Sequence, residues 1–310
     1  MKIVLLFGPT AVGKTELISN LFRTNYEIIN ADSMQVYRSL DVGTAKPARD
    51  LLDRIPHHLI DIRSPLEQFH TGDFVRLADE LASEITARGN IPVICGGTAF
   101  YFKNYLFGLP EIPEIKKEVR DQVRIDLKVM GIASLYRELE SVDPERAGKV
   151  HPNDKYRILR ALEVTRGSGQ PQSGFKSNKS IRPGIDPLIL GLDRERTELY
   201  RRIDQRVDEM FEVGANGRSP LLVDEIQGCF KIGLKETDPG MKGIGYREFF
   251  LMKQTGEFNL ADIRNMIKKN SRHYAKRQMT FFRALPDVKW FHPEDMNLIR
   301  EEITGFLDVP

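Results

Sequence analysis

The stretch GPTAVGKT, Gly8–Thr15, restricts the possible folds of this chain more than any other segment. It matches the phosphate-binding pattern G-x-x-x-x-G-K-[ST] and has the context that this pattern requires. A mostly apolar run, Lys2–Phe7, precedes it and predicts a strand, while Lys14–Phe22 has helical periodicity. A glycine turn without a ligand is the simpler alternative. Because the context is satisfied, we expect an α/β sheet that binds a diphosphate or triphosphate at the end of its first strand.

Each part of this loop has an expected role. The backbone N–H groups of residues 10–15 would face the phosphate oxygens at a helix N-terminus, and Lys14 would add a positive charge. The Thr15 hydroxyl would contact Mg²⁺, the one cofactor that we predict. The predicted diphosphate site comprises Gly8, Pro9, Thr10, Ala11, Val12, Gly13, Lys14 and Thr15.

Short apolar runs alternate with helical periodicity through the first third of the chain. Apolar residues recur at helical spacing in Asp73–Arg88, and Gly89 is expected to end that helix. Strand and helix in alternation predict a parallel sheet flanked by helices, of the P-loop NTPase-like α/β class. The other strands expected here are Tyr26–Asn30, His57–Ile62 and Ile91–Cys95.

The pattern changes near Glu111, where helices follow one another without a convincing strand. A Gly-, Ser- and Pro-rich segment, Gly167–Gly184, then predicts a loop, and Asp186–Asp193 returns to the sheet. We therefore predict a discontinuous α/β core over residues 1–110 and 186–310, with a helical insertion domain over residues 111–185. The expected helices are Glu114–Met130, Ser134–Glu140 and Asp154–Thr165 in the insertion, and Glu195–Val213 and Leu260–Phe282 after it.

Composition places the chain among soluble globular proteins. Of its 310 residues, 41% are hydrophobic and 29% charged, and the net charge is only +2, so any nucleic-acid surface must come from local clustering. Cys95 and Cys229 share no metal-ligand spacing and are expected to be buried thiols in a reducing compartment. No apolar run has the length of a signal peptide or a membrane span. We expect a cytoplasmic protein without membrane contact.

A carboxylate, Asp32, stands at the end of the second expected strand, within IINADSMQVYRSLDVGTAKP. Ligands of open α/β sheets gather at the carboxyl ends of the strands, so Asp32 and the loop at Gly8 should face one crevice. Asp32 could act there as a general base, or it could only cap the following turn, and the residues alone leave both open. Asp61 and Asp193, at other strand exits, are weaker candidates for an aspartate that holds Mg²⁺.

The segment Asp262–Leu285 holds seven Lys or Arg residues and one acid. A solvated helix is the ordinary explanation of a charge run, but the charge here is almost entirely of one sign. Such a stripe can contact the phosphates of RNA. The residues that recur at i+4 on one face are Arg264, Lys268, Arg272 and Lys276.

Eight segments, taken in order, resemble the tRNA isopentenyltransferase (tRNA dimethylallyltransferase) family. They are GPTAVGKT, ADSMQVYRSLDVGTAKP, PHHLIDI, ICGGTAFYFK, DPERAGKVHPNDKYRILRALEV, RRIDQRVDEM, KGIGYRE and YAKRQMTFFR, between residues 8 and 283. The resemblance implies transfer of a dimethylallyl group from dimethylallyl diphosphate to N6 of adenosine-37, next to the tRNA anticodon. The loop at Gly8 would then bind the leaving diphosphate rather than ATP.

The resemblance also implies roles for individual residues. Asp32 would be the general base, Thr98 would contact the target nucleotide, and Arg206 would contact phosphate, although a surface arginine is the alternative for Arg206. The adenosine would have to leave its stack to reach the carboxylate. The residues expected to bind the tRNA anticodon stem-loop are Asp32, Ser33, Met34, Gln35, Thr98, Arg120, Tyr156, Arg157, Ile158, Leu159, Arg160, Lys242, Gly243, Ile244, Gly245, Tyr246, Arg247, Lys276 and Arg277.

Three other functions compete with this interpretation. A small-molecule kinase of the same fold would transfer a phosphoryl group from ATP, and an adenylate isopentenyltransferase would modify free nucleotides. An RNA-binding module could use the phosphate loop as a nucleotide-dependent switch without making a covalent product. For the favoured interpretation we expect a monomer that needs no obligate protein partner.

Overall fold

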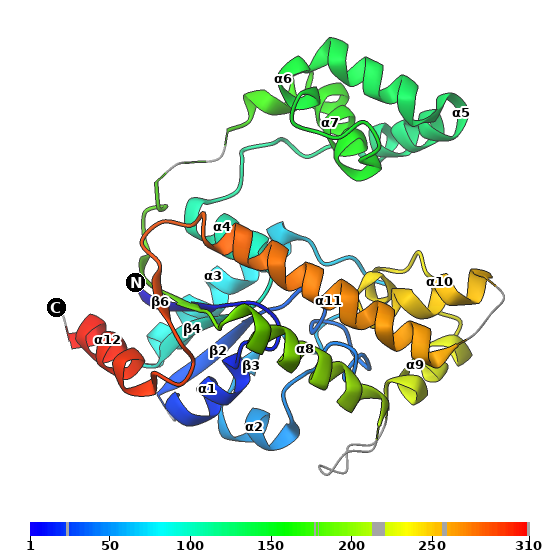
Figure 1. Ribbon diagram of the computed structural model, residues 1–310. Coiled ribbons are helices and arrows are strands. Elements are labelled where there is room, and N and C mark those ends of the chain that lie inside the picture. Colours follow the sequence, from blue (N-terminus) through cyan, green and yellow to red (C-terminus); the bar gives the residue numbers. More distant parts are fainter. Residues whose placement is uncertain (23–24, 177, 179, 213–220, 256–258, 309–310) are drawn as a thin grey trace. The chain divides into compact units, whose positions relative to one another are not determined.

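The computed structural model describes residues 1–22, 25–176, 178, 180–212, 221–255 and 259–308. Its internal contacts divide the chain into two compact units (Figure 1). The first combines Met1–Leu106 with Pro183–Pro310, and the second is Phe107–Arg182. The chain therefore leaves the first unit after the fourth strand, forms the second, and returns to complete the first.

The first unit is built on a sheet of six parallel strands in the order β3-β2-β4-β1-β5-β6. The central strand β1 places Val4 opposite Val93 of β4 on one side and Leu188 of β5 on the other. This arrangement confirms the predicted α/β class. The strands are β1 Lys2–Phe7, β2 Tyr26–Ala31, β3 His57–His58, β4 Ile91–Gly96, β5 Asp186–Leu192 and β6 Lys289–Phe291.

Helices cover both faces of the sheet, because alternate residues of a strand point to opposite sides (Figure 1). Val4 and Leu6 of β1 belong to a buried cluster with residues of α1 (Lys14–Leu21), α8 (Arg196–Phe211) and α12 (Met296–Asp308). On the opposite face Phe7 stacks on Phe282 at a centroid distance of 4.3 Å and meets Phe102 edge-on at 5.1 Å. Those two rings come from α11 (Leu260–Phe282) and α4 (Ala99–Phe107), and α3 (Thr71–Ala87) packs beside them.

Some elements differ from the prediction for identifiable reasons. The strand expected over His57–Ile62 ends at His58, because Leu59 and Asp61 have φ values of 62° and 56°, which no strand accommodates. The remaining elements of this unit were not predicted from periodicity, since most are short. They are α2 Arg49–Arg54, α9 Leu222–Lys231, η2 Pro239–Lys242, α10 Arg247–Thr255, and α4, β6 and α12 as bounded above.

The second unit is helical. Its elements are α5 Lys117–Val142, α6 Pro144–Ala147, α7 Lys155–Ser168 and η1 Gln172–Gly174. Gly131, with φ 76°, kinks α5 where the sequence predicts a break between two helices. Val123, Leu139 and Ile158 are fully buried in its core. Arg166 of α7 ties the kinked helix together through Asp126 at 2.5 Å and Glu138 at 2.7 Å.

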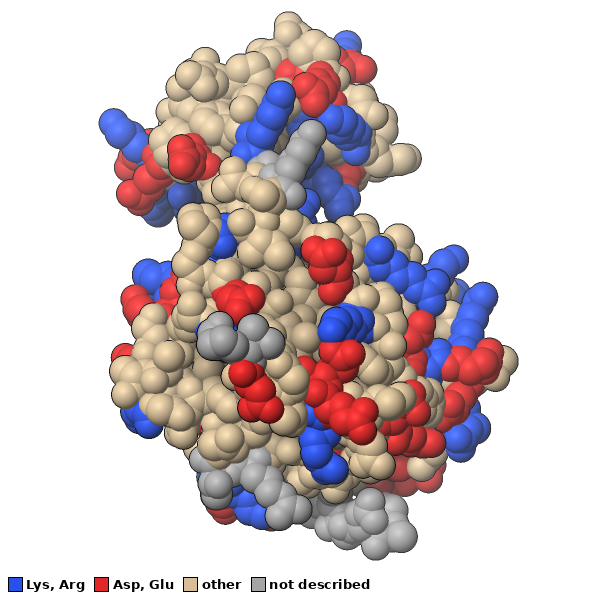
Figure 2. All heavy atoms as spheres, turned by 90° about the vertical axis from the view of Figure 1, so that its left-hand side faces the viewer, with Lys and Arg blue, Asp and Glu red and all other residues tan. Residues whose placement is uncertain are grey.

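Acidic and basic side chains are mixed on the face that Figure 2 shows. Among the described residues, none of the helices combines the length and the apolar character that crossing a membrane would need.

Candidate active site

A cavity of about 900 Å³ opens in the first unit where β2, β4 and β1 end side by side. Its walls bring together segments that the sequence separates by more than 200 residues. Thr10–Thr15, Asp32–Gln35 and Gly97 come from the strand ends, and the segment 43–48 closes one side. From the second half of the chain come Ile203, Arg206, Val207, Met210, Lys242, Gly243, Ile244, Arg247, Ile267, Ser271, Tyr274, Arg277 and Gln278.

The loop at Gly8 curls around its own lysine. Gly13 adopts φ 120°, a conformation open to glycine but strained for other residues, and α1 begins directly after it. The Lys14 amine donates hydrogen bonds to the carbonyls of Gly8 at 2.8 Å and Pro9 at 2.9 Å. Burial lowers the pKa of Lys14 to about 8, and Arg206 adds to this effect, while Cys95 and Asp32 oppose it. An anionic ligand bound in this loop would therefore stabilise the protonated, charged form of Lys14.

Two arginines that sequence reasoning missed support this loop. Arg194 is 8% exposed and donates from Nε to the Val12 carbonyl at 2.7 Å. Arg202 donates to the Ala11 carbonyl at 2.9 Å and pairs with Glu16 at 2.8 Å. The available signal was positional, because Arg194 follows β5 at the same edge of the sheet and Arg202 lies one helical turn before Arg206.

Arg206 reaches the loop, as its predicted role requires, and donates to the Thr10 hydroxyl at 3.1 Å. The Thr10 N–H instead donates to Oε1 of Gln278 at 3.0 Å. The Val12 N–H donates to the Pro9 carbonyl at 3.3 Å. These two bonds correct one detail of the prediction, in which the N–H groups of all residues 10–15 face the ligand. Gln278 is 4% exposed and also donates to the Gly97 carbonyl at 2.7 Å.

Asp32 lines the cavity together with the phosphate loop. Its Oδ1 accepts hydrogen bonds from the N–H groups of Met34 at 2.9 Å and Gln35 at 3.4 Å, so the carboxylate does cap the following turn. Both bonds use the same oxygen. The two interpretations that the sequence leaves open are therefore compatible, because capping through Oδ1 does not occupy Oδ2.

Thr98 supports the Asp32 turn without lining the cavity itself. Its hydroxyl accepts a hydrogen bond from the Ser33 N–H at 2.9 Å, and its own N–H donates to the Ala31 carbonyl at 3.0 Å. Tyr274 of α11, which the sequence did not suggest as a site residue, lies beside it. Burial, helped by the negative charge of Asp32, raises the Tyr274 pKa, and hydrogen bonds with Thr98 and Gln278 offset part of the rise. The Tyr274 hydroxyl therefore stays protonated at neutral pH.

One carboxylate organises the wall formed by the segment after Asp32. Glu225 of α9 accepts hydrogen bonds from three consecutive N–H groups, those of Asp41 at 2.6 Å, Val42 at 2.8 Å and Gly43 at 3.1 Å. It also accepts one from the Tyr246 hydroxyl at 2.6 Å. A Cβ at Gly43 would lie 2.5 Å from the Tyr246 ring, so only glycine fits there. Sequence reasoning did not find Glu225, since nothing local marks it.

The segment Lys242–Arg247, predicted to bind tRNA, has a mixed placement. Lys242, Gly243, Ile244 and Arg247 line the cavity. Tyr246 is fully buried and bonded to Glu225, which corrects the prediction that its side chain contacts tRNA. Gly245 has φ 101° and packs against Gly43.

The basic stripe predicted on α11 is largely engaged within the protein. Arg264 and Lys268 pair with Asp208 of α8, the latter at 2.6 Å, and Arg272 pairs with Asp204. The acids of α8 repeat at the same i+4 spacing as the cations of α11, so the two helices match along their length. This pairing corrects the expectation that the whole stripe faces RNA. Arg277 lines the cavity, whereas Lys276 lines a separate hollow of about 830 Å³ with Arg283.

Neither weaker Mg²⁺ candidate lines the cavity. Asp61 pairs with the buried Lys46 at 2.5 Å, and Asp193 pairs with Arg283 at 2.8 Å. Thr15 is exposed at the start of α1 and lines the cavity together with Asp32. Mg²⁺ commonly keeps several waters and takes its other ligands from substrate phosphates and one or two protein oxygens. The residues present therefore fit a Mg²⁺ ion carried mainly by a bound diphosphate.

In the second unit, the residues predicted to bind tRNA divide by exposure. Tyr156 is 80% exposed, and the exposed Arg157 pairs with Asp154. Arg160 pairs weakly with Glu163 at 3.4 Å. Ile158 belongs to the core, which corrects the prediction for its side chain, while Leu159 and Arg120 are partly buried.

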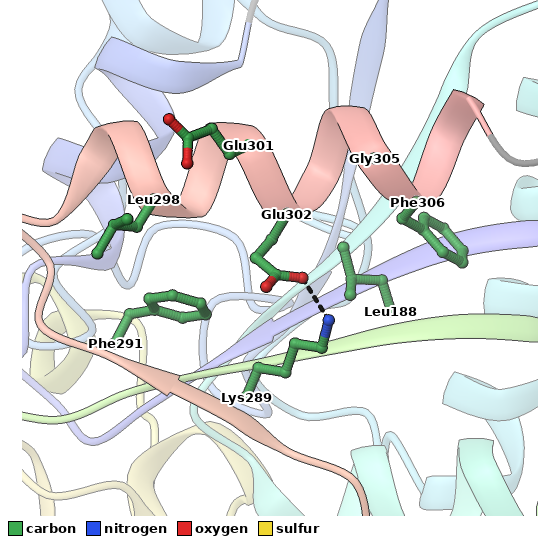
Figure 3. A pocket seen from close by; sticks show the side chains of 8 residues that line it. All are labelled: Leu188, Lys289, Phe291, Leu298, Glu301, Glu302, Gly305 and Phe306. Carbon is green, nitrogen blue, oxygen red and sulfur yellow. Dashed lines mark hydrogen bonds and ion pairs between the residues drawn. The ribbon is translucent and has the colours of Figure 1, made fainter.

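A smaller hollow of about 480 Å³ lies between β6 and α12 (Figure 3). Leu188, Phe291, Leu298 and Phe306 give it an apolar lining, and its lysine, Lys289, is paired with Glu302. Its apolar lining and paired cation contrast with the phosphate loop and carboxylate of the larger cavity.

Comparison with known proteins identifies the family of this chain. The family model described as IPP transferase matches residues 35–285. The chain belongs to this family. It is 43% identical over 296 residues to the tRNA dimethylallyltransferase of Borreliella afzelii, with 95% of each chain covered, and 40% identical to that of Geobacter sulfurreducens, with 93% and 91% covered. As a member, it is an enzyme of the prenyltransferase class with tRNA dimethylallyltransferase activity.

Solved structures agree with this assignment. The full-length tRNA isopentenylpyrophosphate transferase of Bacillus halodurans superposes with a TM-score of 0.69 at 35% identity, covering 99% of this chain and 97% of that one. A eukaryotic dimethylallyltransferase, described as acting on tRNA, gives a TM-score of 0.77 at 26% identity, covering 98% and 77%. The P-loop NTPase-like fold of the first unit is thus shared with enzymes of this family.

Proposed function

We propose that this enzyme transfers the dimethylallyl group of dimethylallyl diphosphate to N6 of adenosine-37, next to the tRNA anticodon. One observation carries the proposal: Asp32 and the phosphate loop line the same cavity of about 900 Å³. A carboxylate and a cationic anion site are what a displacement by an amine with a diphosphate leaving group requires. The names of the relatives support tRNA as the acceptor.

In the proposed step, the N6 amine attacks C1 of the allyl group, the N6–C1 bond forms and the C1–O bond to diphosphate breaks. The N6 proton passes to Oδ2 of Asp32, which acts as the general base. Because the N6 lone pair is delocalised into the ring, such help is worth roughly 10²–10⁴-fold in rate. Thr98 holds the Asp32 turn through the Ser33 N–H, so its role is to position the base.

The leaving diphosphate would be bound by the N–H groups of Ala11 and residues 13–15, by Lys14 and by Arg206. Protonated Lys14 and Arg206 would compensate the negative charge that develops on oxygen, usually the largest contribution to catalysis. When bound beside Thr15, Mg²⁺ would neutralise further charge on the diphosphate. Lys242, Arg247 and Arg277 line the same cavity and would contact tRNA phosphates at its mouth.

A single assay separates this function from its competitors. The protein is incubated with dimethylallyl diphosphate and an unmodified tRNA that carries adenosines beside its anticodon, and the digested nucleosides are analysed by mass. We expect N6-isopentenyladenosine from tRNA and none from AMP. Product from AMP alone would indicate a free-nucleotide enzyme, and ATP-dependent phosphorylation without prenyl transfer would indicate a kinase.

A further inference from the structure

The carboxamide of Gln278 joins the two loops between which the reaction takes place. Its Oε1 accepts from the Thr10 N–H at 3.0 Å, and its Nε2 donates to the Gly97 carbonyl at 2.7 Å. Since the backbone N–H can only donate and the carbonyl can only accept, these partners fix the orientation of the amide. Gln278 is 4% exposed, so water has little access to these two hydrogen bonds.

This bridge lies just beyond the last backbone pairing between β1 and β4. The ladder ends with Phe7 opposite Gly96, and past that point the two chains separate into the phosphate loop and the Gly97–Thr98 loop. Gln278 offers one acceptor and one donor, as a peptide unit does, and so continues the ladder by one step. A Cβ at Gly97 would lie 2.5 Å from Nε2, which shows how closely the amide fills this space.

The bridge connects the leaving-group side of the cavity to the general-base side. Thr10 is also bonded to Arg206, and Thr98, next to Gly97, holds the Ser33 N–H beside Asp32. A displacement needs the attacking nitrogen and the allyl carbon in near contact, and a misplacement of about 1 Å can cost about 10²-fold in rate. The separation of these two loops therefore determines whether bound substrates can react.

We propose that Gln278 is a positioning residue, which sets the separation of the phosphate loop from the Gly97–Thr98 loop through its two hydrogen bonds to their backbones. This inference rests on the proposed function, because it assigns the leaving diphosphate to one loop and the adenosine to the other. Loss of the bridge lowers the rate of the chemical step and leaves the binding of each substrate nearly unchanged.

The variant Gln278→Glu tests this through pH. An ionised glutamate can accept from the Thr10 N–H but presents its second oxygen to the Gly97 carbonyl, where two acceptors repel. A protonated glutamate donates to that carbonyl and restores both bonds, and burial favours this form near neutral pH. We expect the kcat of this variant to be about 100-fold below wild type at about pH 8 and only about tenfold below wild type at about pH 6. The KM for each substrate should stay within about threefold.

Three matched variants complete the experiment. Gln278→Met keeps the volume but removes both backbone bonds and the hydrogen bond with Tyr274, so its kcat should stay low at every pH. Gly97→Ala displaces the amide from the other side and should reproduce the low kcat, with little further loss when combined with Gln278→Met. Gln227→Glu, on the exposed surface of α9, should match wild type throughout.

The results discriminate sharply. A Gln278→Glu profile parallel to wild type, or a loss confined to one KM, overturns the positioning role, and Gly97→Ala still tests it if the glutamate variant does not fold. If the wild-type protein itself makes no prenylated tRNA, the proposed function fails, and this inference fails with it. Wild-type turnover with undiminished kcat in the variants removes the inference alone.

Discussion

The guanidinium of Arg194 donates a 2.7 Å hydrogen bond to the carbonyl of Val12, so the segment after β5 holds the phosphate loop from its outer side. The same group pairs with Glu198 and Glu294, and Arg194 is 8% exposed. The phosphate loop presents N–H groups toward its ligand, so its carbonyls point outward. The hydrogen bond from Arg194 satisfies the outward carbonyl of Val12. Arg194 thereby stabilises the phosphate-binding conformation before any ligand arrives.

Arg194→Met should weaken both the fold and the anion site. A hydrogen bond from a charged donor contributes about 1.5–3 kcal/mol, so we expect the free energy of unfolding in urea to fall by about that amount. Calorimetric titration with inorganic diphosphate should show binding about tenfold weaker, about 1.4 kcal/mol, because the loop loses its support. Arg201→Met, at an exposed position of α8, is the control and should change neither value.

The binding of diphosphate should weaken above about pH 8. The Lys14 pKa is about 8 in the folded protein and 10.5 in its ordinary state, so between these values the unfolded chain binds more protons. The contribution of Lys14 to the free energy of unfolding therefore rises with pH over this interval, while its charge, which the anion needs, is lost. Lys14→Arg keeps its charge, and its affinity should fall less over the same range. Parallel affinity curves would rule out Lys14 as the titrating group.

Asp32→Asn should greatly reduce turnover while leaving tRNA affinity within about twofold. Asparagine keeps an Oδ1 that can accept from the Met34 N–H, so the turn survives, but the amide cannot take a proton from N6. We expect kcat to fall by roughly 10²–10⁴-fold, the usual contribution of a general base. Single-turnover rates and filter binding measure the two quantities separately. A matching loss of binding would make Asp32 a structural residue.

Two arginines on α11 should behave in opposite ways. Arg272 is paired with Asp204, so Arg272→Ala should lower the free energy of unfolding by about 1 kcal/mol or less. The same change should leave tRNA affinity unchanged. Arg277 lines the cavity, so Arg277→Ala should weaken tRNA binding several-fold and flatten its salt dependence. The tRNA affinity of each variant is measured by titration at several fixed ionic strengths, and the stability of Arg272→Ala is measured by thermal unfolding. Equal effects on affinity would contradict the assignment of Arg272 to the α8 pairing.

Glu225→Gln should destabilise the first unit more than Tyr246→Phe does. The amide would turn N–H donors toward the N–H groups of Asp41, Val42 and Gly43, whereas Tyr246→Phe removes one hydroxyl only. We expect losses of about 2–4 kcal/mol and about 1 kcal/mol respectively in urea unfolding. The reverse order would show that the hydroxyl, rather than the backbone N–H groups, depends on this carboxylate.

The sequence predicted those parts of the fold and site that are encoded locally. The phosphate loop, the strands on either side of it and Asp32 at a strand end depend on short-range patterns of apolar residues, glycines and turns. The helices over Asp73–Arg88 and Leu260–Phe282 are long enough for their periodicity to identify them, and the structure contains both. β6 has three residues and offers no such signal.

The missed residues act through partners distant in sequence. Glu225 binds N–H groups 182 to 184 positions earlier, and Gln278 contacts Thr10 across 268 positions. A single glutamate or glutamine on a helix looks like a surface residue until the fold brings its partners to it. The same limitation explains the overestimated basic stripe, because the acids that neutralise it belong to another helix.

The placement of the helical unit between β4 and β5 also constrains how a growing chain can fold. Strand β1 obtains its second neighbour only when Asp186–Leu192 has left the ribosome, after the entire unit Phe107–Arg182 has been made. Until then the N–H and C=O groups along one edge of β1 have no backbone partner and can pair with strands of other chains. The inserted unit, whose contacts are local, can fold during this interval. Synthesis from the N-terminus thus leaves the phosphate loop unsupported until Arg194, Arg202 and Gln278 have been added.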